Sequence, residues 1–141
     1  MPELEYLMLA EYVRQDAGMT HIMGAGIDTF TIPAGQPIAV PVGIVARITF
    51  SSRDEVGAQH DLSLVFSGPG GDLLTISQRF PTPPPPAGVP EHWRTAVSVA
   101  LRVALPIPGH GNYRLQAMLD DDPRLSRSLD VRAIGPQPGQ N

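Results

Sequence analysis

The chain has 141 residues, carries 14 acidic and 10 basic side chains for a formal net charge of −4, and contains no cysteine. These values exclude disulfides and thiolate metal sites, and they disfavour a nucleic-acid-binding surface, which needs a basic patch. A chain of this length is expected to form one domain that buries about two thirds of its unfolded surface without a stabilising metal.

The N-terminal sequence Met-Pro-Glu-Leu-Glu is acidic where a signal peptide would be basic. The longest apolar run, Ala96 to Leu105, is too short to span a membrane and contains Arg102. We therefore expect a soluble, cytoplasmic protein with no membrane partner.

The segment Leu4 to Val13 is apolar on both faces in its middle. A buried strand gives that pattern, and a short amphipathic helix also fits it. The strand is favoured because Asp16-Ala17-Gly18 signals a turn and Met19 to Phe30 is again extended and apolar. Together these segments predict a first hairpin.

Pro33, Pro37 and Pro41 confine the following segment, Thr31 to Pro41, to a loop or a sheet edge, because proline cannot donate to a strand ladder. The clearest strand follows. It runs from Val42 to Phe50 and alternates between two faces. Its inward residues are predicted to be Val42, Ile44, Ala46, Ile48 and Phe50.

A second alternating strand is predicted over His60–Ser67. The turn Ser67–Gly71 connects it to a further strand, Asp72–Phe80, and the two strands are predicted to form a hairpin. The proline-rich segment Pro81 to Pro90 would span about 30 Å in polyproline geometry, enough to cross between sheets that pack about 10 Å apart. The alternative interpretation is a docking peptide for a proline-recognising groove.

Three further strands complete the pattern, with a turn at Asp121-Asp122-Pro123 before the last. They are Trp93 to Leu105, Asn112 to Asp120 and Arg124 to Ile134. The inward face of the middle one is Tyr113, Leu115, Ala117 and Leu119. We expect a single domain over residues 1–134 and a disordered tail over 135–141.

The sequence around Tyr113 fixes the fold class most firmly. A strand ends in a turn that contains Gly109 and Gly111, and Tyr113 then opens the next strand. This order resembles the tyrosine corner of Greek-key sandwiches, in which the phenol bonds to the backbone just upstream. It predicts an all-β, immunoglobulin-like Greek-key sandwich of about 7–9 strands, in which Tyr113, Gly109 and Gly111 form a structural corner.

The segment Asp16 to Phe30, the prolines that follow it, the strand from Val42 and the Gly111-Asn112-Tyr113 strand start together resemble a family of small, uncharacterised bacterial proteins. The resemblance covers most of residues 3–134, although Ala17 interrupts the Asp-Gly pair at its start. It implies a β-sandwich and carries no known activity. A wider resemblance to immunoglobulin-like domains lacks their cysteine pair.

No residue pattern predicts catalysis, a cofactor or a metal site. The four histidines lack metal-ligand spacing, and there is no Gly-x-Ser-x-Gly elbow or phosphate-binding loop. The run Asp120-Asp121-Asp122 could hold calcium only with carboxylates from other loops, and it is ordinary turn chemistry. We therefore expect a protein that is not an enzyme.

Four apolar residues outside the predicted core suggest an interaction surface: Val45, Val65, Met118 and Trp93. If they line up on one sheet they favour protein contact, with self-association as a homo-oligomer first, unless the N-terminal segment or loops cover them. Two alternatives remain open. One is a small-molecule or carbohydrate-binding module that uses end loops at Asp28, Arg53–Gly57, His110 and Asp120–Asp122. The other is a structural subunit of a filament or shell.

Overall fold

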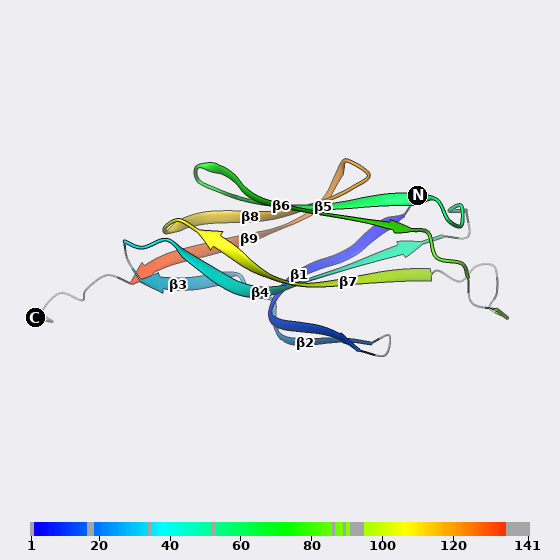
Figure 1. Cartoon of the computed structure of the whole chain (residues 1–141), viewed down its shortest axis with the longest axis horizontal. Coiled ribbons are helices and arrows are strands. Elements are labelled where there is room, and N and C mark those ends of the chain that lie inside the picture. The colour runs from blue at the N-terminus through cyan, green and yellow to red at the C-terminus, as the bar shows by residue number, and fades with distance from the viewer. Residues whose placement is uncertain are drawn as a thin grey trace, which may run out of the picture.

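The computed structural model describes residues 2–16, 19–33, 35–51, 53–85, 87–88, 90 and 95–134. Within these residues it contains nine strands in two sheets and no helix, which confirms the all-β prediction (Figure 1). The strands are β1 (Glu3–Asp16), β2 (Met19–Ala25), β3 (Thr29–Pro33), β4 (Ile38–Phe50), β5 (Gln59–Gly68), β6 (Gly71–Pro81), β7 (Thr95–Ile107), β8 (Gly111–Leu119) and β9 (Asp122–Ile134).

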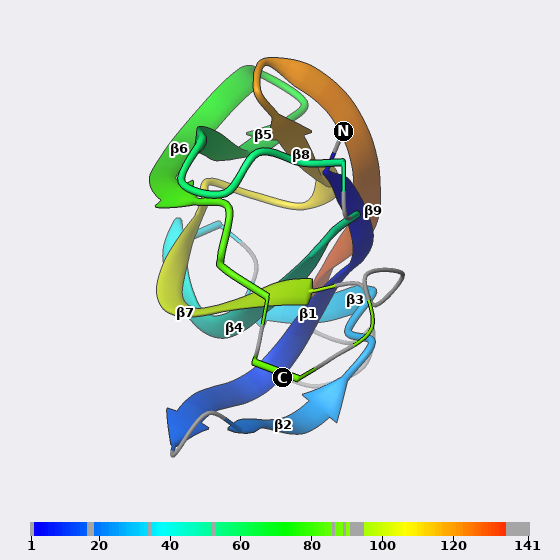
Figure 2. The same ribbon diagram turned by 90° about the vertical axis from the view of Figure 1, so that its right-hand side faces the viewer.

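The two sheets pack face to face. The four-stranded sheet has the order β2-β1-β4-β7, and the five-stranded sheet has the order β3-β9-β8-β5-β6. All neighbouring strands are antiparallel except β3 and β9, which are parallel. Figure 2 looks along the strands from one end and shows the two layers together with the β1–β2 hairpin, which projects beyond them.

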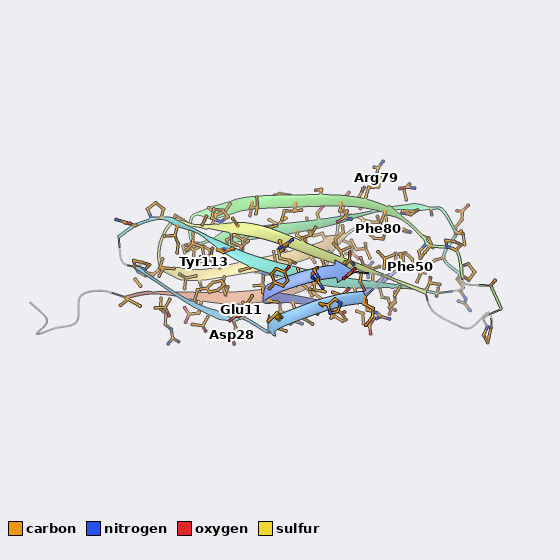
Figure 3. All side chains as sticks on the ribbon, turned by 60° about the horizontal axis from the view of Figure 1, so that its bottom comes forward. Glu11, Asp28, Phe50, Arg79, Phe80 and Tyr113 are labelled. Atoms are coloured by element: carbon orange, nitrogen blue, oxygen red, sulfur yellow. The ribbon has the colours of Figure 1, made fainter. Side chains whose placement is uncertain are left out.

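The core lies between the sheets and consists of the alternate side chains that the sequence pattern assigns to it. Every predicted inward residue of Val42 to Phe50 is buried, and so is every one of Asn112 to Asp120. Figure 3 shows Phe50 and Phe80 toward one end of the sandwich and Tyr113 toward the other. The largest fully buried side chains include Phe50, Phe66, Leu7, Leu9, Ile44, Ile48, Leu62, Leu64, Leu105 and Leu115.

The N-terminal segment is a strand, as predicted, and it pairs with β2 from Ala10↔Ala25 to Asp16↔Met19. The predicted second half of that hairpin is too long, because β2 ends at Ala25 and β3 joins the other sheet. As predicted for a proline-bearing segment, β3 is an edge strand.

The strand predicted to begin at Val42 begins earlier, at Ile38. Pro41 therefore lies within β4, opposite Ala104 of β7, and not in a loop. The pairing of β1 with β4 stops at Gly43. At Pro41, β4 therefore has only β7 beside it, so the missing amide hydrogen interrupts no ladder on the other side.

The connections follow from local turn chemistry. The β8–β9 turn is centred on Asp120 and Asp121, one residue earlier than predicted, and both have a positive φ (52° and 64°), which aspartate tolerates better than most residues. β6 ends at Pro81 and the next strand, β7, belongs to the other sheet, so the chain changes sheets between them, as predicted. Trp93 and the tail 135–141 lie outside the described residues.

Candidate functional site

The second half of β1 leaves its own sheet and lies over that sheet's outer face. We call residues 10–16 and β2 the arm. Val13 sits directly above Gly43, so close that a Cβ added to Gly43 would lie 2.6 Å from a Val13 methyl group. Gln15 Nε2 donates to the Ser98 carbonyl of β7 over 2.6 Å. The arm therefore forms a partial third layer, visible as β2 beneath the β4–β7 layer in Figure 1.

This third layer overturns part of the predicted interaction surface. Val45 is fully buried in a second apolar cluster with Ala10 and Val13, so its assignment to an exposed interaction surface is wrong. The N-terminal segment covers it, which is the alternative that the sequence left open. Val65 and Met118 are half-buried on the other sheet, which places them on the opposite side of the molecule. These residues cannot form one patch with Val45. Trp93, the fourth member, lies outside the described residues.

The exposed apolar residues gather instead on the arm's outward face. Met19 and Met23 are 64% and 65% exposed, and Tyr12 is 36% exposed. Tyr12 lies directly opposite Met23 across the β1–β2 ladder. The Arg102 guanidinium lies over the Tyr12 ring, 4.9 Å from the ring centroid. This surface was not predicted from the sequence. Its available signal was Met-x-His-x-Met, which puts Met19, His21 and Met23 on one strand face.

The glycine-rich turn before β8 forms a backbone-to-phenol contact. The Tyr113 hydroxyl donates to the Gly109 carbonyl over 2.6 Å, and the Tyr113 ring stacks on Phe66 with centroids 5.4 Å apart. Gly111 has a φ of 146°, in the range that favours glycine. These contacts give Tyr113, Gly109 and Gly111 a structural role at the start of β8.

His60 ties together three segments that are far apart in sequence. Its Nδ1 lies 2.8 Å from Asp120 Oδ2 in the β8–β9 turn, and its Nε2 lies 2.8 Å from Thr82 Oγ1 just after β6. Because ionised Asp120 can only accept, Nδ1 donates to it and Nε2 of a neutral imidazole accepts from the Thr82 hydroxyl. Protonated His60 instead donates to Thr82, whose hydroxyl can then donate to the Ala58 carbonyl 3.4 Å away. Both ring nitrogens of His60 are therefore hydrogen-bonded in either protonation state.

The order hydroxyl, imidazole, carboxylate is that of nucleophilic triads. However, Thr82 is only 3% exposed, and its backbone is held by Ala58 and Gly57. The Phe50 and Phe80 rings enclose the imidazole at 5.6 and 5.9 Å. A hydroxyl buried in this way presents no face to a substrate, so the geometry favours a structural tie.

Asp120 gives this tie a pH dependence. Partial burial raises the pKa of Asp120, but the hydrogen bonds from His60 and the Asp61 amide, with the charges of His60 and Arg124, together lower it below its ordinary value. A carboxyl group whose pKa is lowered by folding stabilises the fold above its unfolded-state pKa, and that contribution is lost as the pH falls through the folded-state pKa.

We therefore expect Asp120→Asn to destabilise the protein at pH 7 and the difference to shrink as the pH falls below about 4, the unfolded-state pKa of aspartate. The expected loss is about 1 kcal/mol, because the Asp120 side chain is 43% exposed and solvent screens it. Asparagine keeps the tolerance for positive φ. Urea unfolding from pH 3 to 8 measures the difference, and a constant gap across that range would contradict the assignment. Asp72→Asn, at an exposed site on β6, is the control.

The loops proposed for ligand binding form two groups at opposite ends of the sandwich, so the four do not meet at one site. Asp28 and His110 lie near each other, since the Asp28 carbonyl accepts from the Asp130 amide and both Asp130 and His110 line one shallow depression of about 490 Å³. The Arg53–Gly57 loop lies beside Thr82 and Asp120, near Phe50 and Phe80 at the other end.

In the part of the chain that the structure describes, no three His, Asp or Glu side chains gather as for a metal ion. No described helix is long and apolar enough to cross a membrane.

Two packed sheets, a buried apolar interior and a hairpin arm define this chain as a small β-sandwich protein. The chain belongs to the family of unknown function DUF6941, whose model matches residues 5–132. This confirms the resemblance to an uncharacterised family. No curated protein gave a match. Among solved structures, a candidate β-galactosidase from Bacteroides fragilis is 10% identical with a TM-score of 0.38; the alignment covers 71% of this chain and only 16% of that one.

Proposed function

We propose that this protein is a non-enzymatic protein-contact module that self-associates through its arm. The observation that carries the proposal is the position of the exposed apolar side chains. Of the six large apolar side chains exposed among the described residues, three lie on the arm: Tyr12, Met19 and Met23. The other three are dispersed over a loop, β6 and the end of β9. An apolar cluster on a projecting element is typical of an association surface.

We also propose that the sandwich is an immunoglobulin-like Greek key. The order β1-β4-β7 facing β9-β8-β5 corresponds to A-B-E facing G-F-C in those domains. The tyrosine contact at the start of β8 then falls at the start of strand F, where a tyrosine corner belongs. These features support the assignment independently of any sequence similarity.

The proposal also retains the cytoplasmic location expected from the sequence, which cell fractionation would test.

Size-exclusion chromatography with light scattering over a range of concentrations tests the proposed function. The native chain is expected to double its mass as its concentration rises. Met19→Ser combined with Met23→Ser is expected to raise the dissociation constant by about tenfold or more, because each thioether side chain loses its buried area in the complex. Val56→Ser is the matched control, since Val56 is 54% exposed but lies off the arm. A native chain that stays monomeric at every concentration would rule out self-association.

A filament or shell subunit is the alternative form of the same proposal. A closed two-fold contact through the arm stops at a dimer, whereas a head-to-tail contact continues into an open array. Negative-stain microscopy of the concentrated protein separates the two. Discrete particles are the expected result, and extended assemblies would favour the structural subunit.

A further inference from the structure

The arm ends in an edge strand that lacks the usual protection against pairing. Four strands lie at the edges of the two sheets: β2, β7, β3 and β6. Edge strands of native proteins are commonly blunted by charge, proline or short length. β6 contains Asp72, Arg79 and Pro81; β7 contains Arg102 and Pro106; β3 has five residues and ends at Pro33. β2, Met-Thr-His-Ile-Met-Gly-Ala, has seven residues and contains no proline, aspartate, glutamate or arginine.

The exposed side chains of β2 are symmetric about His21. Met19 and Met23 lie two residues before and after it, so all three point to the same face of the strand. Gly24 has a positive φ of 66°, which limits the regular extended stretch to residues 19–23, with His21 at its centre. If a second copy paired antiparallel about His21, each Met19 would lie opposite a Met23 of the other copy. Such cross-strand apolar pairs stabilise antiparallel sheets.

The charges beside this strand also permit a copy of the chain as partner. Arg14 of β1 lies opposite His21, and its guanidinium pairs with the Asp16 carboxylate at 3.4 Å. The outward face of the arm therefore brings no unbalanced acidic or basic group to a two-fold axis. An acidic or basic partner would find no complementary charge on β2 itself.

We propose that two copies of this chain join their β2 strands edge to edge, antiparallel, with His21 on the two-fold axis and Met19 facing Met23 across it. This rests on the proposed self-association and adds the strand, the register and the symmetry. The four-stranded sheets of the two copies then continue into one another through main-chain hydrogen bonds. The contact is isologous, so it closes at a dimer.

The absence of native cysteine allows a direct test of the register by disulfide trapping. His21→Cys is expected to cross-link efficiently on mild oxidation, because directly opposed residues in an antiparallel pair lie within disulfide range. Met19→Cys is the matched control. In this register the two copies of position 19 are four residues apart, about 13 Å along the strand, so it should not cross-link. An equal mixture of Met19→Cys and Met23→Cys should form the mixed disulfide.

A charge substitution provides a second measurement that does not depend on oxidation. His21→Glu places two carboxylates opposite each other on the axis and is expected to weaken dimerisation more than tenfold. Thr75→Glu, exposed on the β6 edge, should leave dimerisation unchanged. Circular dichroism of each variant checks that the fold is retained.

The outcomes separate the two proposals. If the native chain dimerises but His21→Cys fails to cross-link and His21→Glu still dimerises, the β2 pairing is wrong while self-association stands. If Met19→Cys cross-links as well as His21→Cys, the register is wrong. A native chain that never dimerises overturns both proposals.

Discussion

Phe66→Ala is expected to lower the free energy of unfolding by about 3–5 kcal/mol, because it removes a large buried ring and leaves a cavity. Phe66 is 1% exposed, and its ring stacks nearly parallel on Tyr113, at an angle of 9°. The substitution also removes one side of the contact that fixes the Tyr113 ring. Urea unfolding followed by circular dichroism measures the loss.

Two comparisons make this result specific. Tyr113→Phe keeps the stacked ring and removes only the hydroxyl bond to Gly109, so its expected cost is about 1 kcal/mol. Leu73→Ala, at a side chain that is 36% exposed on β6, should cost clearly less than Phe66→Ala. If Phe66→Ala and Leu73→Ala had equal effects, Phe66 would not belong to the packed interior described above.

Local pattern was sufficient to predict most strands and most of the core. Alternation assigned Ile44, Ile48 and Leu115 to the interior, and each is at most 1% exposed. The reason is physical: a side-chain period of two leaves each strand of a two-layer sandwich only one way to face the interior. The strand interpretation of Leu4 to Val13 had a different basis, because its apolar pattern also fits a helix. The turn signal at Asp16-Ala17-Gly18 and the extended apolar segment after it favoured the strand.

Alternation could not predict what covers the outer face of a sheet. Val45 has the outward parity of a solvent-facing residue, yet it is buried because the arm lies over it. That contact joins the first strand to the fourth, and no local signal encodes it. Gly43 illustrates the same limit. It lies inside a strand, and only the structure shows that its missing side chain makes room for Val13.

The His60 tie was unpredictable for a related reason. Its partners Asp120 and Thr82 are 60 and 22 residues away in sequence, and each alone has the appearance of turn chemistry. Their convergence depends on β5 lying between β6 and β8. Spacing rules for metal or catalytic sites do not detect such a tie, because its residues share neither a helix face nor a strand face.

Gly43→Ala provides the sharpest test of the arm's position, and we expect it to destabilise the protein by about 1–3 kcal/mol through overpacking. The added methyl group would lie 2.6 and 2.8 Å from the two Val13 methyl groups and 2.9 Å from the Val13 backbone nitrogen. The arm must therefore shift away from β4. Hydrogen exchange over residues 10–25 should accelerate, while exchange in β5 and β8 should change little.

A double-mutant cycle assigns this cost to the Val13 contact. Val13→Ala removes the two closest methyl groups, so Gly43→Ala in that background should cost less than it does alone, while the 2.9 Å approach to the Val13 backbone nitrogen remains. Val13→Ala alone is destabilising because it opens a cavity beside Val45. Additive effects of the two substitutions would mean that the arm does not rest on Gly43. The surface formed by Met19, His21 and Met23 would then have a different orientation relative to the sandwich, because β2 pairs with residues 10–16 and moves with them.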